Sequence, residues 1–530
     1  MRTRPAASIA TLAFVVACGV PARPADVVVF ASGTDLESAN PLVTIHPLSR
    51  QVQRHVLFVT LTRLDSALVA QPYFARRLTW NAQRTALTLA LDAGVRWQDG
   101  HPTGSRDVAF TLLRGQDPRS GYPRAGDLAG IDTVITTSDT TVIVRFRSAQ
   151  RDIPAVFAEL PIVPEHLLGS VAPGDMRRAA FSTAPVGNGP FHFMRRDAGQ
   201  RWQFARNDSF PKSMGGPPRI RSLIVAVVDE PTTKFAGLAA GELDFAGISA
   251  SMADLARRDP MIEVMDYPVL FSTGIVFNTH REPFDDARVR RAIGLAIDRR
   301  RLVEAALAGY GTPANGPVPP ENPLALADSA TRNTRLADAL LDSAGWRRGA
   351  NFWRARGRPL EFELLTVGSG DNAVEQLVQA DLAVRGIRVH VRQMELGAFL
   401  ARARAATKDF DALLTGVPGD LSLSYVSAMF ESAQRGGALD YAGYRSPTLD
   451  ALFARARQAT SPRELREGWL AVQRGLAREA PAVWLYHSRG LQGVSARMRG
   501  VSFDLRGELA SITQWTTDGT VPAGQSVAQR

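Results

Sequence analysis

Apolar and polar residues follow two different periods along this chain. Apolar runs, or an alternation of apolar and polar residues, occupy residues 26–33, 86–98, 141–148 and 220–228. Such runs are typical of β-strands, because successive side chains of a strand point to opposite faces of a sheet. The second run stops at Asp99 and Gly100, which form a strong turn signal. The pattern therefore predicts several strands in the first half of the chain.

A helix is predicted directly after this turn, at residues 105–115. Ser105 is a candidate N-cap, because its hydroxyl can accept a hydrogen bond from the first turn. Asp107 lies in that turn, where the helix dipole favours an anion.

A second amphipathic helix is predicted from Ala287 to Gly309. Pro283 precedes it, and either Asp285 or Asp286 can cap its first turn. One face carries apolar residues near helical spacing, namely Val289, Ile293, Ile297 and Val303. We expect the Arg residues to solvate the outer side, and these are Arg288, Arg290, Arg291 and Arg299 to Arg301.

Helical and strand patterns alternate beyond residue 330. A helical period at 334–346 is followed by a β-rich run at 359–367. A second helical period at 373–386 is followed by a β-rich run at 387–394. This β-α-β order favours a mixed α/β lobe with a partly parallel sheet. A long amphipathic helix at 465–481 then leads into another strand.

The N-terminus resembles an export signal. Arg2 and Arg4 precede an apolar stretch that ends at Ala17. The stretch is too short to span a bilayer core of about 30 Å as a helix, but it suits the core of a signal peptide.

Cys18 follows small residues, as in the bacterial lipoprotein box, and is the only Cys of the chain. No disulfide can therefore form within one molecule. We expect a lipoprotein signal peptide at 1–17, lipidation of Cys18 and a linker at 18–25. The alternative is a chance Cys at the end of an ordinary signal peptide.

Composition indicates an ordinary globular protein. The 530 residues exceed what one compact core holds, and 45% of them are hydrophobic. The net charge is +10, but the cationic residues are scattered. We therefore expect a solvated surface and no nucleic-acid partner.

Motifs for catalysis are absent from the sequence. It contains no His-Glu-x-x-His, no phosphate-loop Gly-Lys-Thr and no Gly-x-Ser-x-Gly. Residues 309–314 fit a dinucleotide fingerprint only superficially, because they follow a helix and Pro313 interrupts the next one. The eight His residues are dispersed. The sequence therefore predicts no catalytic residue, no metal site and no cofactor.

Seven stretches together resemble one family, the extracytoplasmic solute-binding proteins of ABC importers, family 5. Residues 89–112 are similar to a family signature and retain Asp99, Gly100, Pro102, Asp107 and Val108. The other stretches follow in the family's order, and they include Pro185–Phe193, Phe277–Arg299 and the closing Glu479–His487. This family includes dipeptide-, oligopeptide- and nickel-binding proteins.

The resemblance implies an α/β, two-lobe periplasmic-binding-protein fold of the class II type, with mixed sheets joined by a hinge. Lobe 1 would contain residues 26–55, 187–276 and 485–530, with an extra subdomain at 56–186. Lobe 2 would contain residues 277–484. Residues 277–299 would then act as scaffold and hinge, since hinge positions lie at element ends.

The resemblance also implies a ligand site around Asp420. In peptide-binding members a carboxylate at this position grips the α-ammonium group of the peptide, and charge-assisted hydrogen bonds of this kind are strong. Gly419 and Tyr425 would belong to the same site, with Tyr425 as a stacking surface. The alternative is a loop Asp that caps the next segment. The stretch departs from the family at Val417, where an aromatic residue is usual.

Together these features predict a monomeric receptor in the periplasm, lipid-anchored to the membrane. It would capture a small solute, foremost a short peptide, and deliver it to an ABC permease in the inner membrane. Alternatives within the fold are a sugar, an opine or a nickel chelate. Alternatives outside it are an exported hydrolase and a tethered sensor.

Overall fold

The structure is a computed structural model, and it describes residues 23–150, 152–327, 331–368, 372–437, 439–459 and 461–518. The predicted signal peptide and Cys18 lie outside these residues. Among the described helices, none combines the length and apolar character needed to cross a bilayer.

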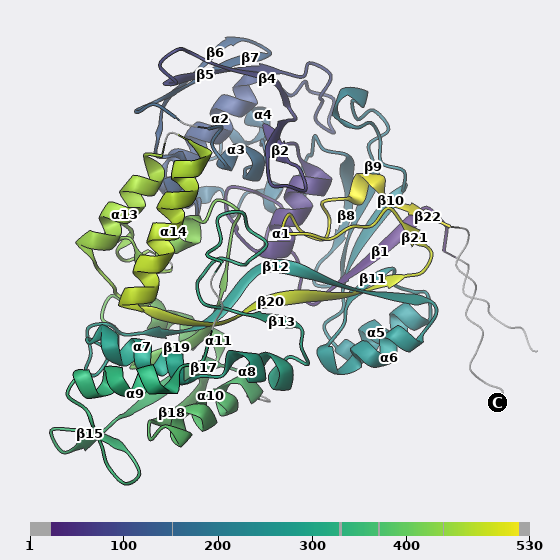
Figure 1. The fold of residues 1–530 in the computed structure, drawn as a ribbon. Coiled ribbons are helices and arrows are strands. Elements are labelled where there is room, and N and C mark those ends of the chain that lie inside the picture. The colour runs from purple at the N-terminus through teal and green to yellow at the C-terminus, as the bar shows by residue number, and fades with distance from the viewer. Residues whose placement is uncertain are drawn as a thin grey trace, which may run out of the picture.

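Two long neighbouring strands connect two lobes (Figure 1). They are β12 (Ile262–Phe277) and β20 (Ala482–Ser495), and they pair antiparallel. Both belong to one 11-stranded sheet that extends into each lobe. The lobes are therefore joined by a shared sheet rather than by loops alone.

The outer strands of this sheet divide between the lobes. On one side of β12 lie β19 (Ala412–Pro418), β17 (Glu361–Val367) and β18 (Arg388–Met394), and β17 is parallel to both of its neighbours. The prediction of a partly parallel sheet beyond residue 330 is thus confirmed. On the other side of β20 lie β11 (Phe245–Gly247), β1 (Val27–Ser32), β10 (Ser222–Val227), β9 (Arg201–Arg206) and β8 (Phe191–Asp197), and β13 (Gly311–Pro313) also pairs with β20.

A separate four-stranded sheet lies above the first lobe in Figure 1. Its strands are β4 (Ala75–Trp80), β5 (Ala86–Leu91), β7 (Thr141–Phe146) and β6 (Ile131–Ser138). Helix α2 (Ser105–Gln116) accompanies this sheet. The N-cap of α2 is Gly104 rather than Ser105, because the Asp107 carboxylate accepts a 2.9 Å hydrogen bond from the Gly104 N–H.

Several helices of the second lobe begin at side-chain caps. Ser446 and Ser461 cap α13 (Pro447–Arg457) and α14 (Pro462–Glu479), each of which has Pro at its start. The other long helices are α7 (Ala287–Ala296), α8 (Arg299–Ala306), α9 (Thr334–Ser343), α10 (Ala373–Val384) and α11 (Leu396–Arg404).

The single helix predicted at 287–309 is in fact two helices. Asp286 caps α7 as expected, by accepting a hydrogen bond from the Arg288 N–H. Asp298 then caps α8, while its own N–H donates to the Asp381 carboxylate. The hydrogen bond to Asp381 lies at the break between α7 and α8. Because Asp381 is distant in the chain, no local pattern predicts this hydrogen bond.

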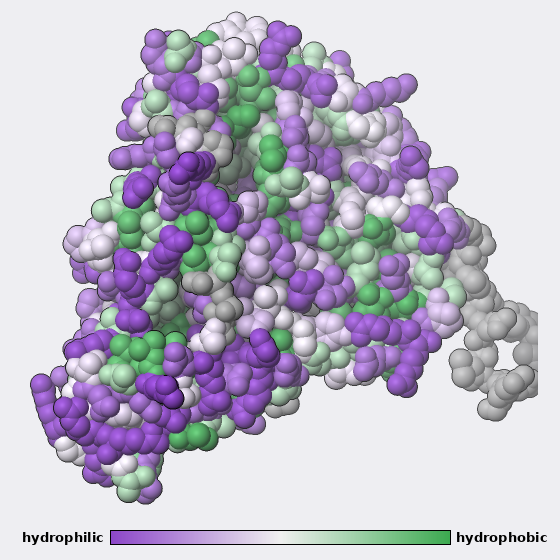
Figure 2. Space-filling model, viewed as in Figure 1, coloured by the Kyte–Doolittle hydropathy of each residue, from purple (hydrophilic) through white to green (hydrophobic). Residues whose placement is uncertain are grey.

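The hydrophobic cores follow the lobes. In the described part of the chain, two clusters of buried residues draw on the first lobe and the four-stranded sheet, and two draw on residues 275–485. Exposed large hydrophobic residues are dispersed along the chain, and Figure 2 shows hydrophobic patches separated by hydrophilic surface.

Two Arg residues expected on the outer side of the helix are buried, so that prediction was wrong for them. Arg290 is 3% exposed and donates to the carbonyls of Phe284, Glu479 and Ala480. Arg299 is 7% exposed and donates to the Trp484 carbonyl at 2.7 Å. Each guanidinium donates hydrogen bonds to backbone carbonyls that are buried, and buried carbonyls need such donors.

Arg299→Leu should therefore lower the free energy of unfolding by about 2 kcal/mol, because buried carbonyls lose their donor. Urea denaturation would measure the change. Arg300, which is exposed, is the control, and Arg300→Leu should change stability by less than about 0.5 kcal/mol. Equal effects of the two substitutions would contradict the structural role of Arg299.

Candidate functional site

A cavity of about 200 Å³ lies where the lobes and the crossing strands meet. Its wall contains residues from five separate parts of the chain, which lie within 45–54, at Glu159, within 267–271, at Pro418, Gly419 and Leu421, and within 504–508. The first lobe, the second lobe and β12 thus all contribute to it. A site built in this way changes shape whenever the lobes move relative to each other.

A smaller cavity of about 30 Å³ adjoins it. The two cavities share Arg54, Leu421 and Arg506 in their walls. The smaller one is otherwise lined mainly by residues of the first lobe. It is therefore a side pocket of the space between the lobes.

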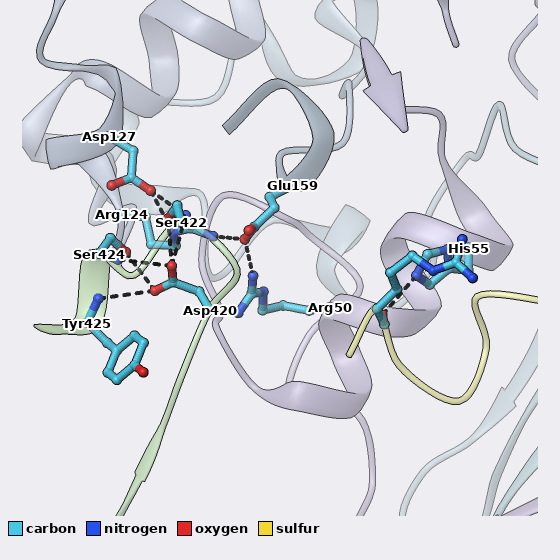
Figure 3. A network of polar contacts seen from close by, with 10 residues as sticks. Arg50, His55, Arg124, Asp127, Glu159, Asp420, Ser422, Ser424 and Tyr425 are labelled. Atoms are coloured by element: carbon cyan, nitrogen blue, oxygen red, sulfur yellow. Dashed lines mark hydrogen bonds and ion pairs between the residues drawn. The ribbon is translucent and has the colours of Figure 1, made fainter. Parts of the chain in front are cut away.

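Asp420 is buried beside the larger cavity and accepts four hydrogen bonds (Figure 3). The hydroxyl of Ser422 donates to Oδ1 and that of Ser424 donates to Oδ2. The backbone N–H groups of Ser424 and Tyr425 donate at 3.0 and 3.1 Å. Asp420 therefore caps α12 (Ser424–Phe430), which corresponds to the capping alternative.

Arg124 reaches Asp420 from the opposite side of the interface. Its Nη2 lies 4.0 Å from Asp420 Oδ1 and donates to Ser422 Oγ at 3.0 Å. Its other partners are Asp127 and Glu159. A guanidinium next to the four-stranded sheet thus contacts the loop that follows β19, which is a direct contact between the lobes.

Glu159, which lines the larger cavity, joins Arg50 of the same wall to Arg124. Its Oε2 accepts hydrogen bonds from both Arg50 and Arg124 (Figure 3). Burial raises the pKa of the Glu159 carboxyl, but Arg124 and Arg50 outweigh burial and lower it. The pKa of Asp420 is lowered in the same way, since Arg124, Ser422 and Ser424 outweigh the effect of burial.

The two other predicted site residues have different surroundings. Gly419 lines the cavity and its N–H donates to the Leu270 carbonyl of β12 at 2.8 Å. Tyr425 is only 3% exposed, and its hydroxyl donates to the Pro317 carbonyl at 2.6 Å. The ring packs against Gly419, where a Cβ would lie 3.2 Å from it. As ligand contacts, all three residues remain predictions.

The β12–β20 ladder is interrupted at the same place. The pairing changes register between Pro268 and Ser272, opposite Arg489 and His487. Residues 268–271 line the cavity. The wall of the cavity therefore includes the irregular segment of the strand that crosses between the lobes.

Sequence reasoning missed Arg50, Arg54, Arg124 and Glu159. They come from segments far apart in the chain, and no spacing connects them. It also missed a surface cluster in which Asp99, His101 and His166 place one ligand atom each within 4.8 Å of the others. These side chains could hold a metal ion, but none of them lines either cavity.

Comparison with known proteins identifies the family. Residues 69–437 match the model for the middle part of bacterial extracellular solute-binding proteins, family 5. The chain belongs to this family. It is a family of solute-binding proteins rather than of enzymes, and the resemblance seen in the sequence is confirmed.

Relatives of this family 5 protein are distant in sequence and close in fold. It is 24% identical to the oligopeptide-binding protein AppA of Bacillus subtilis over 94% of this chain and 92% of AppA. It is 26% identical to Protein XP55 of Streptomyces lividans over 88% and 85% of the two chains.

Solved structures confirm the two-lobe fold. The AppA structure with a nonapeptide has a TM-score of 0.80 and 22% identity, covering 93% of this chain and 99% of that one. The structure of NikZ from Campylobacter jejuni with Ni(L-His) has a TM-score of 0.79 and 20% identity, covering 93% and 100%.

Asp420→Asn should lower the free energy of unfolding at pH 7 by about 2 kcal/mol, because a buried carboxylate facing Arg124 is lost. The pKa values of Asp420 and Glu159 are lowered in the folded state from ordinary values of 3.8 and 4.5. Their contribution is therefore complete above those values and is lost as the pH falls through the lower folded-state pKa values.

Urea denaturation at pH 7 and at pH 3 would measure both effects. The difference between wild type and Asp420→Asn should shrink at the lower pH. Asp132→Asn, at an exposed position, is the control and should have little effect at either pH. A difference that stays constant with pH would contradict the charged role of Asp420.

Proposed function

We propose that this protein is an extracytoplasmic receptor that captures a short peptide between its lobes and delivers it to an ABC permease. The observation that carries the proposal is the cavity of about 200 Å³ walled by both lobes. Solute-binding sites are typically concave, apolar in part and placed between domains. Capture alone requires no bond to be made or broken.

Closure about a hinge would enclose the solute. The hinge of this proposal lies in β12 at Pro268–Ser272, where the pairing with β20 is irregular. This position differs from the boundary at residue 277 expected from the sequence. A ligand can drive closure only because it contacts both lobes in the closed state.

Several features support a compact ligand. Pockets for drug-sized ligands usually measure about 300–1,000 Å³, so the larger cavity suits a short peptide in this conformation. Relatives with bound peptide support that choice. A nickel chelate, as in the NikZ structure, is the first alternative, and a sugar or an opine remains within the scope of the fold.

Asp420 would grip the ammonium group of such a peptide only by exchanging partners. Its four acceptor positions already receive Ser422, Ser424 and Tyr425. Gly419 lies in the cavity wall and can offer its backbone to the ligand.

The remaining parts of the proposal are lipidation at Cys18, location at the cell envelope and a monomeric state.

Mass spectrometry of small molecules that co-purify with the protein, followed by calorimetry with the same compounds, would test this function. A bound peptide, and a smaller radius of gyration when it is added, would support it. Steady chemical conversion of the compound would favour the exported hydrolase instead. Binding without stimulation of any permease ATPase would favour the tethered sensor.

Leu421→Trp should weaken solute binding at least about tenfold, because the larger side chain fills space in both cavities. Calorimetry with the identified solute would measure the loss. Leu396→Trp, at a position that is 54% exposed on α11, is the control. Equal affinities of wild type and Leu421→Trp would place the solute elsewhere.

A further inference from the structure

The side pocket beside the larger cavity has an unusual wall. Its charged or titratable members, apart from Tyr73, are Arg54, His55, Arg63 and Arg506, and no acidic residue is among its lining residues. Its volume is about 30 Å³, which exceeds the roughly 10–15 Å³ that a cavity needs to hold one water molecule. A small polar group fits such a space, and the surrounding charges favour an anion.

Arg54 differs from the other two guanidinium groups of this wall. Arg506 pairs with Asp504, and Arg63 donates to the Ala510 carbonyl at 2.8 Å. The buried Nε of Arg54 has no hydrogen-bond partner, and no ion pair or hydrogen bond joins its side chain to another residue of the described ranges. Arg54 is partly buried as a residue, and a guanidinium without a partner in such a place is costly and therefore uncommon.

One carboxylate lies near Arg54 without a hydrogen bond to it. The nearby carboxylate is Glu159, which influences the Arg54 pKa, and its Oε2 already receives Arg50 and Arg124. One carboxylate thus serves two guanidinium groups before Arg54 is counted. The Oε1 atom of Glu159 has no hydrogen-bond partner, and the carboxylate compensates the Arg54 charge only in part, through the field that raises the Arg54 pKa.

The titration of neighbouring groups reflects the same excess of positive charge. Burial lowers the pKa of His55 well below its ordinary value, and Arg54 and Arg63 lower it further. Burial and Arg50 lower the pKa of Arg54 to about 10. Both groups would be stabilised in their protonated form by an anion in the pocket.

We propose that Arg54, with Arg63 on the same wall, binds a carboxylate group of the solute in this side pocket. The proposal rests on the proposed function and adds the chemistry of one ligand group to it. The pocket shares Arg54, Leu421 and Arg506 with the larger cavity. A solute held between the lobes therefore reaches Arg54 with one terminal group.

The size of the pocket selects a carboxylate over larger anions. A carboxylate is planar and matches the fork of a guanidinium with two parallel hydrogen bonds. A short peptide carries this group at its C-terminus, and an organic acid carries it as well. The two sources share the recognised chemistry, and the experiment distinguishes them.

The test compares each acid with its own amide on wild type, Arg54→Gln and the exposed control Arg300→Gln. Calorimetry with trialanine and trialanine amide should show that wild type and the control prefer the free acid by about tenfold or more. In Arg54→Gln the preference should vanish, with the affinity for the amide unchanged. Arg54→Lys should restore part of the preference.

Thermal unfolding of the unliganded variants separates binding from structure. Arg54→Gln should melt at the wild-type temperature or above it, because an unpaired buried charge is removed. A lower melting temperature together with an unchanged preference for the acid would assign Arg54 a structural role. Equal binding of acid and amide by wild type, or a preference that persists in Arg54→Gln, would also overturn the proposal.

If neither trialanine nor its amide binds, the result would count against a peptide as the solute. It would not by itself count against a carboxylate site at Arg54. The same comparison would then use acetate and succinate against acetamide and succinamide. Stabilisation of wild type by the acids, absent in Arg54→Gln, would retain the side pocket as a carboxylate site for an organic acid. No stabilisation by any acid would overturn it.

Discussion

The two lobes are held together by one backbone ladder, and the rest of the architecture depends on it. β12 and β20 pair from Ile262 and Ser495 to Val276 and Ala482. Such a ladder resists bending where its hydrogen bonds are regular. It is irregular at Pro268, which has no N–H to donate. The segment in which we propose the hinge is therefore also part of the wall of the cavity.

Charged side chains across the interface set a second constraint. Arg124 contacts Ser422 and faces Asp420, and these contacts exist only while the lobes are close. Buried ion pairs are stabilising only when every member has partners. In the proposed closure, the protein's own side chains would contribute, and a solute would have to supply only the remaining free-energy difference between the open and closed states.

Local pattern predicted much of the fold but little of the site. The β-α-β order beyond residue 330 follows from spacing alone, and the structure confirms it. Spacing left the cap of α7 open between Asp285 and Asp286, and the structure shows Asp286. The burial of Arg290 and Arg299 does not follow, because carbonyls far along the chain hold them. Arg124 and Ser422 are 298 positions apart, and only the tertiary fold brings them together.

The charges near the cavity also explain why its two ends differ as binding sites. A carboxylate offers about four acceptor positions, and those of Asp420 are all used by Ser422, Ser424 and Tyr425. An ammonium group arriving there must displace a partner, so part of its binding energy is spent on the exchange. Arg54 displaces nothing when it receives an anion. In the proposed mode of binding, selectivity for a solute would therefore depend more on the group that meets Arg54 than on the group that meets Asp420.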